Sequence, residues 1–135
     1  MKKFIYILIS LVIVIGLAIV VILNLPQSSS QNKKTDLSID SHSLFEEFNT
    51  DEAKANIKYS NKTIEVQGIV KAITKDQQGS DVIILDGGND FAGVLCTLEK
   101  PLNTELKPGD KLKIKGQCNG ILMDVILNKC LIINE

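Results

Sequence analysis

The sequence predicts a mostly β protein: a small five-stranded Greek-key barrel with short N-terminal helices, behind a single N-terminal transmembrane helix. Three observations lead to this prediction. They are a long apolar N-terminal run, five short segments with strand periodicity, and an interruption between the third and the fourth of these segments. We divide the 135 residues into an anchor over residues 1–25, a flexible linker over 26–42 and one domain over 43–135.

Residues 4–25 are long enough to cross a bilayer as a helix, since they would span ~33 Å against a hydrocarbon core of ~30 Å. The lysines at 2–3 place this end in the cytoplasm, although the lysines at 33–34 weaken the charge bias. A cleaved signal peptide is the alternative, but residues 24–27 offer no small-residue cleavage site. We expect an uncleaved single-pass anchor in the cytoplasmic membrane with an extracytoplasmic domain, periplasmic where the cell has an outer membrane.

The linker and two short helices are expected before the first strand. Residues 26–42 are rich in Ser, Gln, Asn and Lys, which is typical of a flexible segment. Ser43 and Glu46 form a capping-box pattern, and Asp51 can cap a second helix. We therefore predict a helical segment over 43–59 that packs three apolar side chains against a larger element: Leu44, Phe48 and Ile57.

Strand periodicity begins at Thr63. The five predicted strands start at Thr63 and cover 82–85, 91–98, about 111–118 and 125–133. Their number, short length and interruption around Pro101 match the OB architecture, a small Greek-key barrel. A sandwich fragment is the alternative, but strands this short would leave its edges unpaired.

The charge balance argues against nucleic acid. Without Lys2 and Lys3, thirteen of the 15 basic residues remain against 16 acidic residues, a net charge of about −3 for the rest of the chain. Arg is absent, so no bidentate clamp for phosphate or carboxylate is available.

A set of short motifs runs through the segment from about residue 44 to 133. They are Leu44, Phe45, Phe48, Asp51–Ala53, Tyr59, Ile64–Val70, Gly93–Cys96, Lys107–Asp110, Lys115–Cys118 and Asp124–Cys130. With these motifs the segment resembles the tRNA_anti-like family. The resemblance implies an OB fold, as found in bacterial membrane-attached or lipid-anchored proteins, and no agreed ligand; the family name is not an activity.

A ligand surface can be predicted by analogy with other OB domains, which bind across their second and third strands and the loops after strands one and four. Here those loops are residues 75–80 and 122–124. We expect the partner to be an envelope protein, a peptide or a glycan near the membrane. The candidate contact residues are Lys75, Gln77, Phe91, Leu122, Met123 and Asp124.

The alternative function is single-stranded nucleic-acid binding through a lysine stripe, which we define as Lys111, Lys113 and Lys115. These residues alternate with apolar ones along the fourth predicted strand. The favoured interpretation is the solvated face of an amphipathic strand, where Lys also protects against edge pairing.

Three cysteines outside the cytoplasm raise the question of a disulfide. Cys118 and Cys130 flank the last turn, and we predict that they pair. Two reduced core residues are the alternative. Cys96 is expected in the core and is the alternative partner.

The sequence offers no catalytic constellation. His42 is the sole imidazole, so no nucleophile has an evident base. The turn with Asp86 and Asp90 lacks the pattern of a calcium loop, and the cysteine spacings do not fit zinc. We predict no enzyme activity, no metal and no cofactor.

Overall fold

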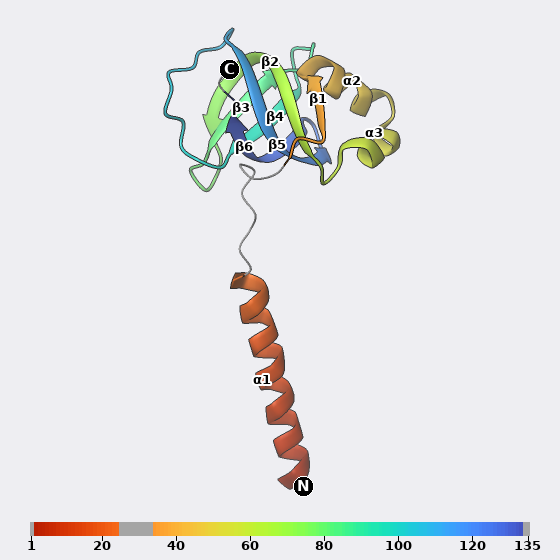
Figure 1. Cartoon of the computed structure of the whole chain (residues 1–135), viewed down its shortest axis with the longest axis vertical. Coiled ribbons are helices and arrows are strands. Elements are labelled where there is room, and N and C mark those ends of the chain that lie inside the picture. Colours follow the sequence, from red (N-terminus) through yellow and green to blue (C-terminus); the bar gives the residue numbers. More distant parts are fainter. Residues whose placement is uncertain (1, 25–33, 134–135) are drawn as a thin grey trace.

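The computed structural model describes residues 2–24 and 34–133, as one long helix and a barrel domain (Figure 1). The mostly β barrel with short helices and an apolar N-terminal helix is confirmed. The elements are α1 (Lys2–Asn24), β1 (Leu37–Asp40), α2 (Ser41–Thr50), α3 (Glu52–Tyr59), β2 (Thr63–Lys75), β3 (Asp81–Asp86), β4 (Gly93–Leu98), β5 (Lys111–Ile121) and β6 (Val125–Ile132).

The barrel closes because β2 is long enough to pair with two strands. Its first half, Thr63–Ile69, pairs antiparallel with β5, and its second half, Val70–Lys75, pairs with β3. A register shift between Val70 and Ala72 marks the bend between the halves. The chain then runs antiparallel into β4, which pairs parallel with β6, and β6 pairs antiparallel with β5.

The linker predicted over residues 26–42 extends too far toward the C-terminus, because its last residues form a strand and the start of a helix. Leu37–Asp40 form β1, which pairs parallel with residues 64–67 of β2, and α2 begins at Ser41. The physical reason is that Leu37 and Ile39 alternate with polar residues and pack against the core. Residues 25–33 of the predicted linker lie outside the described residues.

The two short helices cover one side of the barrel, and their caps differ in part from the prediction. Asp40, rather than Ser43, caps α2, since its Oδ1 accepts a hydrogen bond from Ser43 N at 3.0 Å. Asp51 caps α3 as predicted, accepting from Lys54 N at 3.0 Å. Leu44 and Phe48 are buried, whereas Ile57 is 82% exposed, so the prediction that Ile57 packs inward is wrong.

A bulge in β6 decides which of its side chains enter the core. Val125 and Leu127 point inward, and strict alternation would bring Lys129 inward next. Lys129 instead takes a left-handed conformation with φ 52°, and the register to both neighbouring strands shifts there. The extra residue makes Cys130 the next buried side chain.

Candidate ligand surface

One outer wall of the barrel carries no charge across its centre. The register aligns Ala72 of β2 with Ile84 of β3, Ile84 with Leu95 of β4, and Leu95 with Ile126 of β6. These four half-buried side chains form a row that crosses four strands, and we call this wall the uncharged face. The sequence held a signal for it that we did not use: the run Val82–Leu85 is apolar at every position, so both faces of β3 had to be apolar.

Three strongly exposed apolar side chains flank one end of this face. Phe91 is 90% exposed, Leu122 86% and Met123 72%. Their loops are tied together because Gly93 N donates to Asp124 Oδ1 at 2.7 Å, at the point where β4 and β6 begin side by side. We call Phe91, Leu122 and Met123 the apolar rim. Phe91 precedes β4 instead of starting it, since Asn89 Oδ1 accepts from the backbone of Phe91 and holds it in a turn.

The predicted residues Lys75 and Gln77 lie at the opposite end of the face. Lys75 pairs with Asp81, where β2 turns into β3, and Nζ lies 2.6 Å from Oδ1. Gln77 is exposed in the turn that follows. A strand of six residues, such as β4, separates the two ends by roughly 20 Å. The predicted contact residues therefore lie at two separate ends of one face. At one of these ends, the Asp124 carboxylate accepts a hydrogen bond from the backbone N–H of Gly93.

Asp81 fixes the geometry of the far end. Its Oδ2 accepts from Leu102 N at 2.8 Å, which fastens the long β4–β5 connection to the start of β3. The hydrogen bond from Leu102 and the ion pair with Lys75 lower the pKa of Asp81. The ionised form that holds the loop therefore persists to more acidic pH than in an ordinary Asp.

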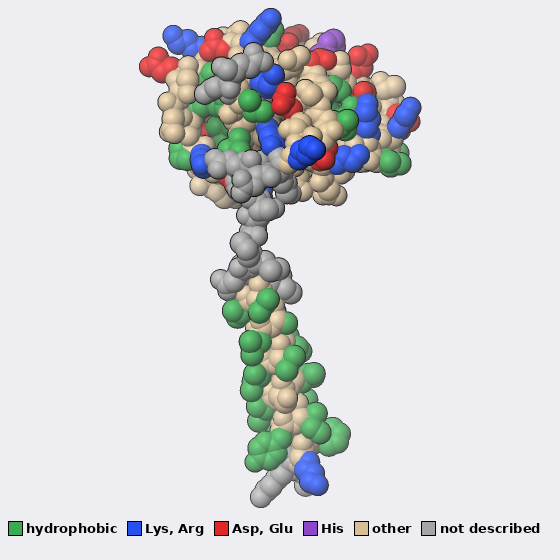
Figure 2. All heavy atoms as spheres, in the orientation of Figure 1, with side chains coloured by type: hydrophobic (Ala, Val, Ile, Leu, Met, Phe, Trp, Pro, Cys, Tyr) green, Lys and Arg blue, Asp and Glu red, His purple; other side chains and the backbone are tan. Residues whose placement is uncertain are grey.

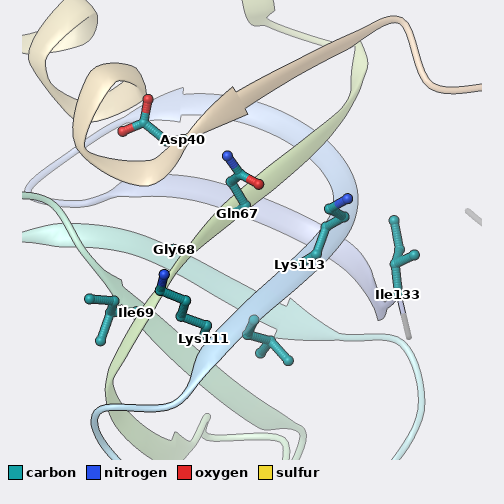
Figure 3. A pocket seen from close by; sticks show the side chains of 8 residues that line it. Asp40, Gln67, Gly68, Ile69, Lys111, Lys113 and Ile133 are labelled. Atoms are coloured by element: carbon teal, nitrogen blue, oxygen red, sulfur yellow. The ribbon is translucent and has the colours of Figure 1, made fainter. Parts of the chain in front are cut away.

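The lysine stripe lies on another wall, formed by β1, β2 and β5. Lys111, Lys113 and Lys115 stand opposite Ile69, Gln67 and Glu65 of β2. We call this wall the charged face. A pocket of about 620 Å³ opens on it between Asp40, Gln67, Gly68, Ile69, Lys111, Leu112, Lys113 and Ile133 (Figure 3).

The charge on this second wall is mixed. Lys113 Nζ lies 3.5 Å from Glu65 Oε1, and the Glu65 backbone is also the register partner of Lys115. Figure 2 shows Lys and acidic side chains interspersed over the visible side of the domain, whereas α1 carries hydrophobic side chains along its length. A continuous basic groove of the kind that tracks a phosphate backbone is absent from this view of the described residues.

The predicted Cys118–Cys130 disulfide is not formed in this structure. All three cysteines are free and buried. Cys118 faces Leu127 across the β5–β6 pair, because register shifts in this hairpin and the bulge at Lys129 carry Cys130 past it. Burial raises the pKa of the Cys118 thiol.

The turn with Asp86 and Asp90 is held by the protein itself. Asp86 Oδ1 accepts from Gly88 N at 3.0 Å, and its carbonyl accepts from the Ser41 hydroxyl at 2.6 Å. His42 packs against Gly88, where a Cβ would collide with the imidazole. Within residues 2–24 and 34–133, no group of three His, Cys, Asp or Glu side chains is arranged to hold a metal.

The geometry is that of an OB barrel, and residues 1–132 match the tRNA_anti-like family model. The chain belongs to the tRNA_anti-like family. None of the curated proteins matches it significantly.

Two solved structures are similar to this tRNA_anti-like chain. A lipoprotein from Klebsiella pneumoniae, whose given name describes it as nucleic acid-binding, is 18% identical with a TM-score of 0.52; the match covers 74% of this chain and 92% of the other. The yeast Stn1 and Ten1 structure is 18% identical with a TM-score of 0.45, covering 82% and 69%. At this identity, the Klebsiella structure supports the fold alone.

Proposed function

We propose that this tRNA_anti-like protein is a membrane-anchored binding module that holds an extended segment of a partner protein across its uncharged face, outside the cytoplasm. The observation that carries the proposal is the row Ala72–Ile84–Leu95–Ile126 with the apolar rim at its end. Exposed apolar patches of this kind mark interaction surfaces, and interface centres are depleted in charged residues.

The anchor supports the membrane part of the proposal. Residues Lys3–Val21 of α1 are long and apolar enough to cross a membrane, and none of them is buried against the domain. The lysines at positions 2 and 3 favour a cytoplasmic N-terminus, which puts the barrel on the other side. A signal sequence would pass the same test of length and composition, so N-terminal sequencing of the mature protein checks this part: an intact N-terminus is expected.

The chemistry of the face favours a protein partner over nucleic acid. Single-stranded nucleic acid needs aromatic platforms for base stacking and a basic groove for the backbone. The row on the uncharged face has neither, and the one aromatic residue of the rim is Phe91. An extended peptide can instead bury apolar side chains against Ile84 and Leu95 and reach Met123 at the rim.

Site-directed photo-crosslinking in native membranes tests this proposal with the full-length protein. A photoreactive residue is placed at Leu95 or Met123 on the uncharged side, and at Gln67 or Lys111 on the charged face as the matched control. We expect one specific protein adduct from the first two positions and none from the controls. Leu95→Asp should lower the yield of the adduct at Met123 by about 100-fold, a hot-spot effect. Equal adducts from all four positions, or none, would refute the proposal.

A second candidate function is single-stranded nucleic-acid binding on the charged face. It is favoured by Lys111 and Lys113, which both line the pocket there, and by the name given to the similar Klebsiella lipoprotein. Fluorescence anisotropy with a 5′-labelled oligonucleotide at low salt decides between the two. Binding that weakens steeply with salt and is lost in Lys111→Ser/Lys115→Ser would establish this candidate. Under the leading proposal we expect neither.

A further inference from the structure

The barrel core contains three thiols in fixed relation to one another. Cys96, Cys118 and Cys130 each have 0% exposure. Leu127 of β6 faces Cys118 on one side and Cys96 on the other, so these two cysteines are two strands apart. Two strand spacings amount to roughly 10 Å, beyond the Cα separation of ~4.4–6.8 Å that a disulfide spans. A Cys96–Cys118 bond is therefore excluded by the register.

Cys130 is directed toward Cys96. The bulge at Lys129 sets Cys130 beside Leu98 in the neighbouring strand β4, two residues from Cys96 on the same inward face. Burial raises the pKa of Cys130, and so does the neighbouring Cys96 side chain. No corresponding contact with Cys130 contributes to the environment of Cys118, whose side chain interacts with the backbone of Gly120.

Gly116 makes room for the Cys130 sulfur. A Cβ at position 116 would lie 2.5 Å from Cys130 Sγ, so any larger residue would displace it. The absence of a side chain at this position of β5 leaves room for the Cys130 sulfur inside the barrel.

We propose that Cys96 and Cys130 form a disulfide when the barrel folds in an oxidising compartment, while Cys118 remains a thiol. The inference rests on the extracytoplasmic location in the proposed function. The oxidant is an organic disulfide, carried by a small thiol or a thiol–disulfide oxidoreductase. One protein thiolate attacks it to give a mixed disulfide and one released thiol; the second protein thiolate then displaces the second thiol. The two protein sulfurs lose two electrons, and both protons end on the released thiols.

The reaction belongs to folding and not to the folded state. Both sulfurs are fully buried, and the raised pKa of Cys130 keeps it a thiol, so an oxidant meets little thiolate in the closed barrel. During folding the strands are still separable and both thiols can react. Once formed, the bond links β4 to β6, the two strands that carry the ends of the apolar rim.

Peptide mapping reads the pairing directly, since trypsin separates the three cysteines. The Lys–Pro bonds at 100–101 and 107–108 resist cleavage, so Cys96 lies in peptide 76–111, Cys118 in 116–129 and Cys130 in 130–135. The full-length protein is denatured and reduced in detergent, refolded in a glutathione redox buffer, alkylated and digested. We expect peptides 76–111 and 130–135 to be joined, and peptide 116–129 to carry the alkyl group.

The same map applied to protein from alkylated cells separates this inference from the proposed location. Three alkylated cysteines after refolding, or a bond that includes Cys118, would overturn the pairing. A Cys96–Cys130 bond after refolding with three free thiols in cells would overturn the extracytoplasmic location and leave the pairing in place. Cys118→Ser is the matched control and should keep the bond. The oxidised protein should melt on the order of 10 °C above the reduced protein, because the bond closes a long loop.

Discussion

The two outer walls of this barrel have the same strand geometry and opposite chemistry. Along β5, the outward side chains of the charged face are lysines paired with Glu65 and Gln67 of β2. Along β4, the outward side chains of the uncharged face are Gly93, Leu95 and Thr97, with Ile84 and Ile126 beside Leu95. Only the first wall looks like an ordinary solvated surface.

This difference is the reason why we propose the uncharged face as the binding surface. A charged wall keeps a strand soluble and needs no partner to explain it. An apolar row beside an exposed rim exposes hydrophobic area to water, which is costly unless another surface covers it. Our proposal therefore places the binding site on the wall with less charge, and four substitutions, two on each wall, probe the comparison.

The largest effect is expected from Gly93→Ala at the rim end of the uncharged face. A Cβ on Gly93 would collide with the carbonyl oxygen of Leu85, a backbone atom that cannot move aside as a side chain can. We expect a loss of about 3 kcal/mol in the free energy of unfolding, the upper range for overpacking. Urea denaturation followed by circular dichroism measures it. Thr97→Ala, four residues further along the same strand, should cost well under half as much; equal losses would contradict the steric argument.

This glycine also shows how far the sequence could predict the structure. Alternation in β5 and the short apolar run of β3 were sufficient to predict the strands, and the Gly-rich turn before β4 was evident. The close contact of Gly93 with Leu85, the bulge at Lys129 and the sharing of β2 between β3 and β5 depend on tertiary register. Local periodicity carries no information on register, so the sequence could not show that the predicted contact residues lie at two ends of one face, or that Cys118 faces Leu127.

A smaller effect is expected from Asp124→Ala, which removes the link between the two loops of the apolar rim. Gly93 N would lose the acceptor that now lies 2.7 Å away. Leaving a partly buried N–H unpaired costs about 1–2 kcal/mol. Hydrogen exchange should show faster exchange of the Gly93 amide, with little change in β5. Asp124→Asn keeps an acceptor oxygen and should lose less than half as much; protection of Gly93 unchanged in the Ala variant would refute the link.

On the charged wall, Asp40 should give a pH-dependent effect smaller than about 1 kcal/mol, the usual contribution of a whole N-cap, because a neutral cap still accepts a hydrogen bond. Hydrogen bonds from the Ser43 hydroxyl and N–H lower the pKa of Asp40 below its ordinary value of 3.8. A lowered pKa in the folded state means that the ionised cap stabilises α2 fully above about pH 4. This contribution disappears as the pH falls through the lowered value.

The comparison with Asp40→Asn isolates the contribution of the Asp40 charge to the free energy of unfolding, because Asn still caps a helix but does not titrate. Other carboxylates with lowered pKa, such as Glu47 and Asp81, titrate in both proteins and cancel in the difference. The difference in free energy of unfolding between wild type and Asn variant should be constant from pH 5 to 8 and should move in favour of the variant below pH 4. A difference that does not change down to pH 2 would contradict the cap.

The smallest effect, a few tenths of a kcal/mol, is expected from Glu65→Gln on the charged face. The pair with Lys113 is 3.5 Å long, and both side chains retain more than a fifth of their exposure, at 22% and 26%. Exposed pairs of this kind contribute little, and salt screens what they contribute. The difference from wild type should vanish near 1 M salt.

The same Glu65→Gln variant is the sharpest comparison of the two walls, because it leaves the lysine stripe without its central carboxylate. If the charged face bound nucleic acid, Glu65→Gln would strengthen oligonucleotide binding at low salt, whereas crosslinking from Leu95 would stay the same. We expect the variant to change neither, because the binding surface that we propose is the wall that Glu65 does not face.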